Sequence, residues 1–386
     1  MDVVILGCHV SGLGVIRALA GRARLIGVSY DEDDPGFVSR YLDERHRAPH
    51  PSRHRDDYIS FLLDHADAWE GAVLIDTDDD TAMAVAQNRK RLAARYRVAT
   101  PEWAVLRQFI LKEEAWTLAA KCGVPHLTTI ILPPGEQPSE HLDYPCILKP
   151  SQGHAFKSVF GRKNFKIESD DALNEKLALC ATHGLTMMLQ EIIPGPDTSI
   201  EKCMVYIDRN GQRRAAFFYN KLRQNPPQFG IARVAISTEV NPEVEDLSTR
   251  LLSAARYRGI CTVEFRRDAR DGALKLMEVN TRMPRMNWLA TYAGINFPWI
   301  LCQDQMEQAP VPQPEYRVPA YWIEAYADWY HSCRHRNRED FTLREYIAPY
   351  LARHHSFAVL SVRDLRPFLM QGWSFVQRAL SRSTRQ

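Results

Sequence analysis

The segment LMEVNTR, residues 276–282, places three polar side chains of different chemistry at alternate positions. Successive side chains of a β-strand point to opposite faces, so Glu278, Asn280 and Arg282 are predicted to share one face. A solvated edge strand would explain this pattern without any chemistry. A carboxylate, an amide oxygen and a guanidinium on one face are also the groups that could hold a cation beside an anion.

The preceding segment, GICTVEFRRDARDG, reads as a second strand that ends at the turn Asp271-Gly272. Glu264 on this strand is therefore predicted to face Glu278 across a hairpin. Two facing carboxylates repel each other unless a positive group lies between them. With the amide of Asn280 they form an all-oxygen set, which suits Mg²⁺, and Mg²⁺ in such sites usually also binds substrate phosphates.

Candidate phosphate-binding cations occur upstream of this hairpin. Lys149 ends the apolar segment YPCILKP, from which its ammonium group could extend toward an anion. Lys112 begins a helical segment, and GRKNF adds Arg162 and Lys163. Each of these cations, taken alone, is more often a solvated surface charge.

A strand followed by a Pro-Gly turn occurs in LQEIIPG, residues 189–195. Glu191 lies at the end of this strand, with Ile192 and Ile193 after it. The extended backbone there could pair with the edge of an adenine base while isoleucine side chains cover the ring. As an isolated peptide this segment is unremarkable.

The first hundred residues alternate strands and helices, which predicts a parallel sheet. Gly7, Gly12 and Gly14 match neither a dinucleotide-binding loop nor a P-loop, so they are interpreted as glycines of a tight strand-to-helix turn. TDDDTA, residues 77–82, is expected to cap a helix. A proline-rich connector, QAPVPQPEYRVPA, precedes a last segment that looks helical and rich in Trp and Tyr.

Composition excludes several classes of protein. The net charge of +2 gives no case for a nucleic-acid partner. Eight cysteines are scattered without a CxxC pair, which argues against a zinc site and favours reduced thiols in the cytoplasm. No apolar run reaches 18 residues, so no transmembrane segment is expected.

From about Thr100 to Cys302, the order of these motifs resembles the ATP-grasp superfamily, with YPCILKP and LMEVNTR together as the most specific features. Residues 256–282 and the segment KLRQNPPQFG, residues 221–230, look like the D-aspartate ligase-type carboxylate–amine ligases. The resemblance implies an α/β fold in three parts. These are an N-terminal parallel α/β domain (1–99), a two-lobed ATP-grasp core (100–304) and a helical C-terminal extension (305–386).

The resemblance also implies ATP and Mg²⁺ as cofactors and a role for each candidate residue. Lys112 and Lys149 would hold the ATP phosphates. Glu191 and the backbone near Ile193 would bind the adenine, and Asp197 would bind the ribose. The Mg²⁺ would be coordinated by Glu264, Glu278 and Asn280, and Arg282 would stabilise the acyl phosphate and the tetrahedral intermediate.

We also expect the carboxylate substrate or the acceptor to contact Lys221, Arg223 and Arg285. Pro226 and Pro227 would stiffen the loop that follows the first two cations, which would hold them at fixed positions. The alternative is that Lys221 and Arg223 are a solvated strand edge.

The reaction implied by the resemblance is ATP-dependent amide-bond formation between a small carboxylate and a small amine, through an acyl phosphate. Two alternatives stay open. One is an ATP-dependent carboxylase or another acyl-phosphate enzyme with a different acceptor, and the other is a non-catalytic nucleotide-binding regulator. The assembly state is also open, with a homodimer among the options.

Overall fold

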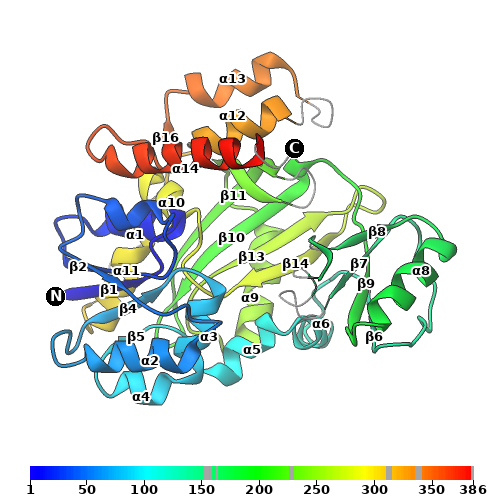
Figure 1. Ribbon diagram of the computed structural model, residues 1–386, viewed down its shortest axis with the longest axis horizontal. Helices are drawn as coiled ribbons and strands as arrows, with labels where there is room; N and C mark the ends of the chain where they lie inside the picture. The colour runs from blue at the N-terminus through cyan, green and yellow to red at the C-terminus, as the bar shows by residue number, and fades with distance from the viewer. Residues whose placement is uncertain are drawn as a thin grey trace.

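The computed structural model describes residues 1–150, 156, 159–161, 164–225, 230–309, 315–334 and 341–383. Within these residues the strands form three sheets with helices packed around them (Figure 1). A parallel sheet lies at the N-terminal end, a long central sheet crosses the middle, and a small sheet lies at the opposite end (Figure 1). The predicted α/β fold class is confirmed.

The N-terminal sheet is parallel throughout, in the order β3-β2-β1-β4-β5. Its strands are β1 (Asp2–Leu6), β2 (Arg24–Ser29), β3 (Glu44–Arg47), β4 (Val73–Asp76) and β5 (Arg97–Val98). The helices of this part are α1 (Val10–Leu19), η1 (Pro35–Val38, a 3₁₀-helix), α2 (Arg55–Asp64), α3 (Asp79–Gln87) and α4 (Arg89–Ala93).

Strand β1 is apolar along its whole length because both faces of the sheet are covered. Val3 and Ile5 pack with Leu13 of α1 in one core, and Val4 packs with Leu62 of α2 in another. The strand-to-helix turn needs its glycines, since a Cβ on Gly12 would lie 2.1 Å from the Gly7 carbonyl oxygen. This agrees with the packing interpretation of these glycines.

The small sheet is antiparallel, in the order β6-β9-β7-β8. Its strands are β6 (Thr129–Leu132), β7 (Cys146–Pro150), β8 (Phe165–Ile167) and β9 (Met187–Glu191), and helix α8 (Asp170–Ala181) packs on it. Helices α5 (Trp103–Ile110) and α6 (Lys112–Lys121) precede it in the chain. The small sheet and α8 together are called the small lobe below.

The central sheet has the order β14-β13-β10-β11-β12-β15-β16 and is antiparallel except for its last pair. Its first five strands are β10 (Ile200–Ile207), β11 (Arg213–Asn225), β12 (Ile231–Ser237), β13 (Gly259–Arg267) and β14 (Leu274–Asn280). Helix α9 (Pro242–Ala254) packs on this sheet, while α10 (Asn287–Ala293) and α11 (Phe297–Gln305) join the core of α1. The short 3₁₀-helix η2 (Asp197–Ser199) leads into β10.

The C-terminal part supplies more than helices. Strands β15 (Tyr321–Ile323) and β16 (His355–Phe357) extend the central sheet beyond β12. Helices α12 (Ala325–Arg334), α13 (Leu343–Leu351) and α14 (Arg366–Ser383) lie together along one side of the molecule (Figure 1). Among the described helices, none is both long enough and apolar enough to cross a bilayer.

Candidate active site

The β13–β14 hairpin brings the polar residues of the opening motif together. Glu264 is paired with Glu278 across the hairpin, and Thr262 is paired with Asn280. The Asn280 Nδ2 donates to Glu278 Oε1 (3.0 Å), and Arg282 Nη2 donates to Asn280 Oδ1 (2.9 Å). The three side chains therefore form one hydrogen-bonded line on a shared face.

The two carboxylates of the hairpin have different surroundings. Glu278 is exposed, whereas Glu264 is buried and forms ion pairs with Lys221 Nζ (3.0 Å) and with Lys202. Burial alone would raise the pKa of Glu264, but the two ammonium groups lower it to about 2. The expected repulsion between the carboxylates is thus already relieved by two lysines.

Lys202 was not recognised in the sequence as a site residue. It lies on β10 directly opposite Glu264, and its side chain is about 10% exposed. A lone lysine in the apolar strand IEKCMVYI is a signal, because a buried cation needs a partner. Its partner could be found only by knowing that β10 pairs with β13.

Arg282 connects this hairpin to the N-terminal sheet. Its Nε contacts Asp79 Oδ1 at 3.2 Å. Asp79 begins α3 at the carboxyl end of β4, and Asp78 caps the same helix by accepting from the Thr81 backbone N–H, as expected for this acidic segment. The carboxyl ends of parallel strands are where ligands usually bind in such sheets.

A cavity of about 250 Å³ lies where these elements meet. Its lining from the N-terminal sheet includes His9, Thr77 and Asp78, and its lining from the central sheet and beyond includes Lys202, Tyr219, Lys221, Thr262, Glu278, Asn280, Arg282 and Arg285. Glu278, Asn280 and Arg282 therefore share one cavity with both lysines that are paired with Glu264, although Glu264 itself does not line it.

Lys149 and Lys112 form the candidate phosphate site on the small lobe side. Lys149 donates to the buried Gln190 side chain, and Lys112 lies close enough to interact with it electrostatically. Burial and the neighbouring Lys112 charge lower the pKa of Lys149 to about 7, while the Glu278 carboxylate opposes this effect. Within the described residues no acid forms an ion pair with Lys149, so the two lysines together are suited to an anion.

Glu191 is occupied by other groups. Its carboxylate accepts from the Thr128 backbone N–H (2.9 Å), from Lys275 (3.1 and 3.2 Å) and from Arg270 (2.7 Å). An adenine amino group would have to share these oxygens. The contacts attach the end of β9 to the β13–β14 hairpin.

Two further predicted nucleotide residues lie beyond the end of β9. The side chain of Ile193 is buried in the core that includes α9, so only its backbone could meet a base. Asp197 accepts from Gln224 Nε2 at 2.7 Å. Nothing in these contacts tests the predicted adenine and ribose roles, which stay predictions.

Arg223, predicted to contact the substrate, is not among the described residues that line this cavity, and it is paired within the protein; the substrate contact stays a prediction. Its guanidinium makes a bidentate ion pair with Asp328 (2.8 Å for both bonds) and donates to the carbonyls of Glu345 and Tyr346. The side chain is only 5% exposed, and it stacks near the rings of Phe341 and Tyr346. Its role is to fix α12 and α13 against β11.

Lys221 and Arg285, by contrast, do line the cavity, and Arg285 is paired with Glu324 of the C-terminal part. The other candidate cations, Arg162 and Lys163, and the stiffening pair Pro226-Pro227 lie outside the described residues.

A Mg²⁺ ion would find an incomplete set of protein ligands here. Among the described residues, no three His, Cys, Asp or Glu side chains are grouped to hold a metal. Glu278 is exposed and accepts a hydrogen bond from Asn280, so its carboxylate fits a cation, whereas Glu264 would first have to release a lysine. This donor set fits Mg²⁺ that arrives with nucleotide phosphates, which supply the remaining oxygens.

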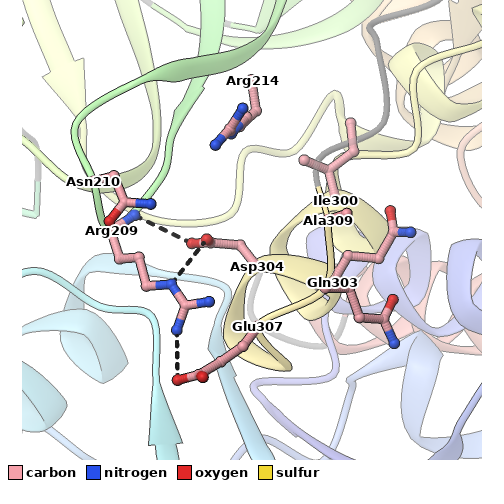
Figure 2. A pocket seen from close by; sticks show the side chains of 9 residues that line it. Arg209, Asn210, Arg214, Ile300, Gln303, Asp304, Glu307 and Ala309 are labelled. Carbon is pink, nitrogen blue, oxygen red and sulfur yellow. Dashed lines mark hydrogen bonds and ion pairs between the residues drawn. The ribbon is translucent and has the colours of Figure 1, made fainter.

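A second cavity, of about 240 Å³, shares no residue with the first. Figure 2 shows Arg209 between Asp304 and Glu307, with its Nη1 at 2.7 Å from Glu307. Arg214 is paired with Asp208. These charges are already neutralised within the protein, so this cavity contributes no candidate site.

Proteins of similar sequence are known. A family model described as "ATP-grasp in the biosynthetic pathway with Ter operon" matches residues 184–325. D-aspartate ligase of Enterococcus faecium is 24% identical over 264 residues. That alignment covers 65% of this chain and 63% of the ligase, so it spans less than two thirds of that protein.

Solved structures share the fold. N5-carboxyaminoimidazole synthetase from Staphylococcus aureus, complexed with ADP, superposes with a TM-score of 0.66 at 14% identity, covering 87% of this chain and 84% of that one. L-amino acid ligase from Bacillus licheniformis superposes with a TM-score of 0.60 at 15% identity, covering 81% and 75%. The family match and the ligase alignment support the ATP-grasp superfamily and a distant homology to D-aspartate ligase, while these solved structures show the fold alone.

Proposed function

We propose that this ATP-grasp enzyme is a carboxylate–amine ligase that forms an amide bond through an acyl phosphate. The observation that carries the proposal is the arrangement of charges on and beside the β13–β14 hairpin. Lys149 and Lys112 offer a cationic site that interacts with the Glu278 carboxylate, and Glu278, Asn280 and Arg282 follow one another in a hydrogen-bonded line. Phosphoryl transfer needs this combination of anion binding and charge neutralisation.

The substrate carboxylate would attack the γ-phosphorus of ATP, which forms the acyl phosphate and releases ADP. The amine would then attack the acyl carbon, lose a proton and expel inorganic phosphate. Bound Mg²⁺ would neutralise phosphate charge, and Glu278 with Asn280 would hold it. Arg282 would stabilise negative charge on the acyl phosphate and on the tetrahedral intermediate, because its guanidinium is fixed by Asn280 and Asp79.

The distant homology to D-aspartate ligase supports an amine as the acceptor. The similar carboxylase-type structures show the fold alone, since they are about 14–16% identical. Carboxylation and nucleotide-dependent regulation are therefore outcomes that the experiment below must distinguish.

The test is a matrix of small carboxylates and amines assayed for ADP release, with mass spectrometry of the products. A ligase will release ADP only with both substrates and will yield the mass of their condensation product. A carboxylase will instead require bicarbonate, and a regulator will bind nucleotide without turnover. Glu278→Gln should lower turnover roughly 100-fold or more while leaving the fold intact, and full activity in this variant would contradict the assignment.

A further inference from the structure

Exposed apolar side chains gather at the start of α14. Val362 is 87% exposed, Leu365 47%, Leu369 64% and Trp373 63%. Leu369 and Trp373 are spaced by four residues on α14, and Leu365, whose carbonyl accepts from the Leu369 N–H, continues the same stripe just before the helix begins. Burying such side chains is favourable, so a set of them exposed to water in one place is a sign of a contact surface.

The opposite side of α14 is firmly attached to the protein. Phe368 and Phe375 stack on Tyr326, with ring centroids 4.5 and 5.6 Å apart. Ser374 donates to Asp33 at 3.0 Å, and Gln371 donates to a side-chain oxygen of Glu324 at 3.1 Å. The helix is thus held in one orientation, with its apolar stripe directed away from these contacts.

The loop before α14 is anchored in the same way. Asp364 is buried, lies 3.4 Å from Arg17 and accepts a hydrogen bond from Ser39 at 2.8 Å. Its neighbours Arg363 and Val362 are exposed. The buried aspartate therefore fixes the position of the exposed residues on either side of it.

Positive charge lies beside the N-terminal end of the stripe, whereas the acids Asp31, Glu32 and Asp33 line a cavity with Gln371, Ser374 and Phe375 of the attached side. Arg363 and Arg366 are exposed beside the stripe, and the exposed Arg40 donates to the Arg363 carbonyl. Residues 341–383 contain six arginines and two acids. Both acids are already engaged, Asp364 with Arg17 and Glu345 in the cap of α13, so neither neutralises the arginines beside the stripe.

We propose that these residues form a docking surface for an anionic lipid bilayer. The surface, named the α14 patch, consists of Val362, Leu365, Leu369 and Trp373 with Arg363 and Arg366. Exposed Trp and Leu beside arginines are the residues with which interfacial helices enter a headgroup layer. Each arginine near an anionic membrane adds electrostatic attraction. The helix would lie on the bilayer with its apolar stripe toward the lipids.

Charge argues against a second copy of this chain as the occupant. In a two-fold symmetric dimer the same patch meets itself, so Arg363 and Arg366 would be brought toward their own copies. An acidic lipid surface complements these arginines instead. The proposal is independent of the reaction that the cleft performs.

The test is sedimentation of the full-length protein with vesicles of phosphatidylcholine, with or without 30% phosphatidylglycerol. We expect the protein to bind the anionic vesicles, and 0.5 M NaCl should weaken this binding. Its affinity for the neutral vesicles should be lower by a factor of roughly ten or more. Leu369→Ser combined with Trp373→Ser should reduce binding at least tenfold. Arg363→Gln combined with Arg366→Gln should abolish the preference for anionic vesicles.

The matched control is Leu179→Ser combined with Val240→Ser, which changes exposed apolar residues elsewhere (38% and 49% exposed) and should bind like the unmodified protein. Circular dichroism and thermal melting check that each variant is folded. Absence of vesicle binding, or equal binding by patch and control variants, would overturn the proposal. So would a dimer in solution that the serine variant converts to a monomer, because the patch would then be a protein interface.

Discussion

Two pairs of lysines flank the candidate active site, and they differ in what neutralises them. Lys202 and Lys221 share the buried carboxylate of Glu264. Lys149 and Lys112 lie beside each other, and within the described residues Lys149 has an amide partner, Gln190, in place of an acid. The first pair is satisfied without a ligand, whereas the second pair has repulsion that an anion would relieve.

This difference separates a structural use of charge from a functional one. Removing one partner of a satisfied buried ion pair lowers the stability of the fold strongly, because the other charge remains buried without a partner. Two neighbouring like charges without a counter-charge lower the stability of the free protein. Such a pair is retained where a ligand of opposite charge binds between them. The variants below test this distinction, from the largest expected effect to the smallest.

Glu264→Gln should destabilise the protein by about 3–5 kcal/mol, because it leaves two buried lysines without an acid. Urea denaturation measures the change in the free energy of unfolding. Glu278→Gln is the matched control on the facing strand, and because Glu278 is exposed its effect on stability should stay below about 1 kcal/mol. Equal losses in the two variants would show that Lys202 and Lys221 do not depend on Glu264.

Lys149→Met should weaken nucleotide binding by about 1.5–3 kcal/mol, the range for a hydrogen bond to a charged group. It should not reduce the free energy of unfolding, since it removes the repulsion with Lys112. Titration calorimetry with ADP measures the affinity. The control is Lys166→Met, which removes an exposed lysine of β8 paired with Glu168, and it should leave ADP affinity unchanged. Loss of stability without loss of affinity would place Lys149 with the structural pair.

Arg285 combines features of both pairs, since it is bonded to Glu324 and also lines the cavity. Arg285→Ala should raise the KM for the carboxylate substrate roughly tenfold, while the KM for ATP stays constant. Steady-state kinetics with each substrate varied in turn checks this. Arg223→Ala is the contrasting variant, and it should lower stability rather than raise either KM. A rise confined to ATP would assign Arg285 to the nucleotide.

The smallest expected effect is a fraction of a proton taken up on nucleotide binding at pH 7.5. Lys149 is then partly neutral in the free enzyme, because burial and Lys112 lower its pKa to about 7, and bound phosphate should restore its charge. Calorimetry in buffers of different ionisation enthalpy measures the uptake. Lys149→Met should abolish it, and persistent uptake in that variant would point to another group.

The same lowered pKa affects the stability of the free enzyme with a definite sign. Between about pH 7 and pH 10.5, the unfolded chain binds more protons at Lys149 than the folded protein does. The contribution of Lys149 to stability therefore rises with pH across this window, and it is least favourable below pH 7. Nucleotide should flatten this dependence.

The parts of the site that could be read from the sequence are those set by local geometry. Glu278, Asn280 and Arg282 follow from the two-residue period of a strand and its continuation, and the facing Glu264 follows from a single hairpin turn. Strand β1 and its helix were predictable because a fully apolar strand must be covered on both faces.

The parts that could not be read depend on partners distant in the chain. The pairing of Arg223 with Asp328, more than a hundred residues later, cannot be read from the segment around Arg223. The role of Lys202 depends on its contact with Glu264, and that contact exists because β10 pairs with β13. The contribution of β15 and β16 to the central sheet was missed because strands of three residues have too little pattern to detect.

The attachment of Glu191 to the hairpin has a mechanical consequence. Glu191 ends β9 and is bonded to Lys275 of β14, and the Leu276 backbone N–H, one residue further along β14, donates to the Pro125 carbonyl at 2.7 Å. If the small lobe rotates when nucleotide enters, these bonds mark the axis. Points near an axis have short lever arms, so Glu278, two residues beyond Leu276, should keep nearly the same distance from the end of β9 at every angle. Strand β8, two positions from β9 in the small sheet, should sweep the longest arc.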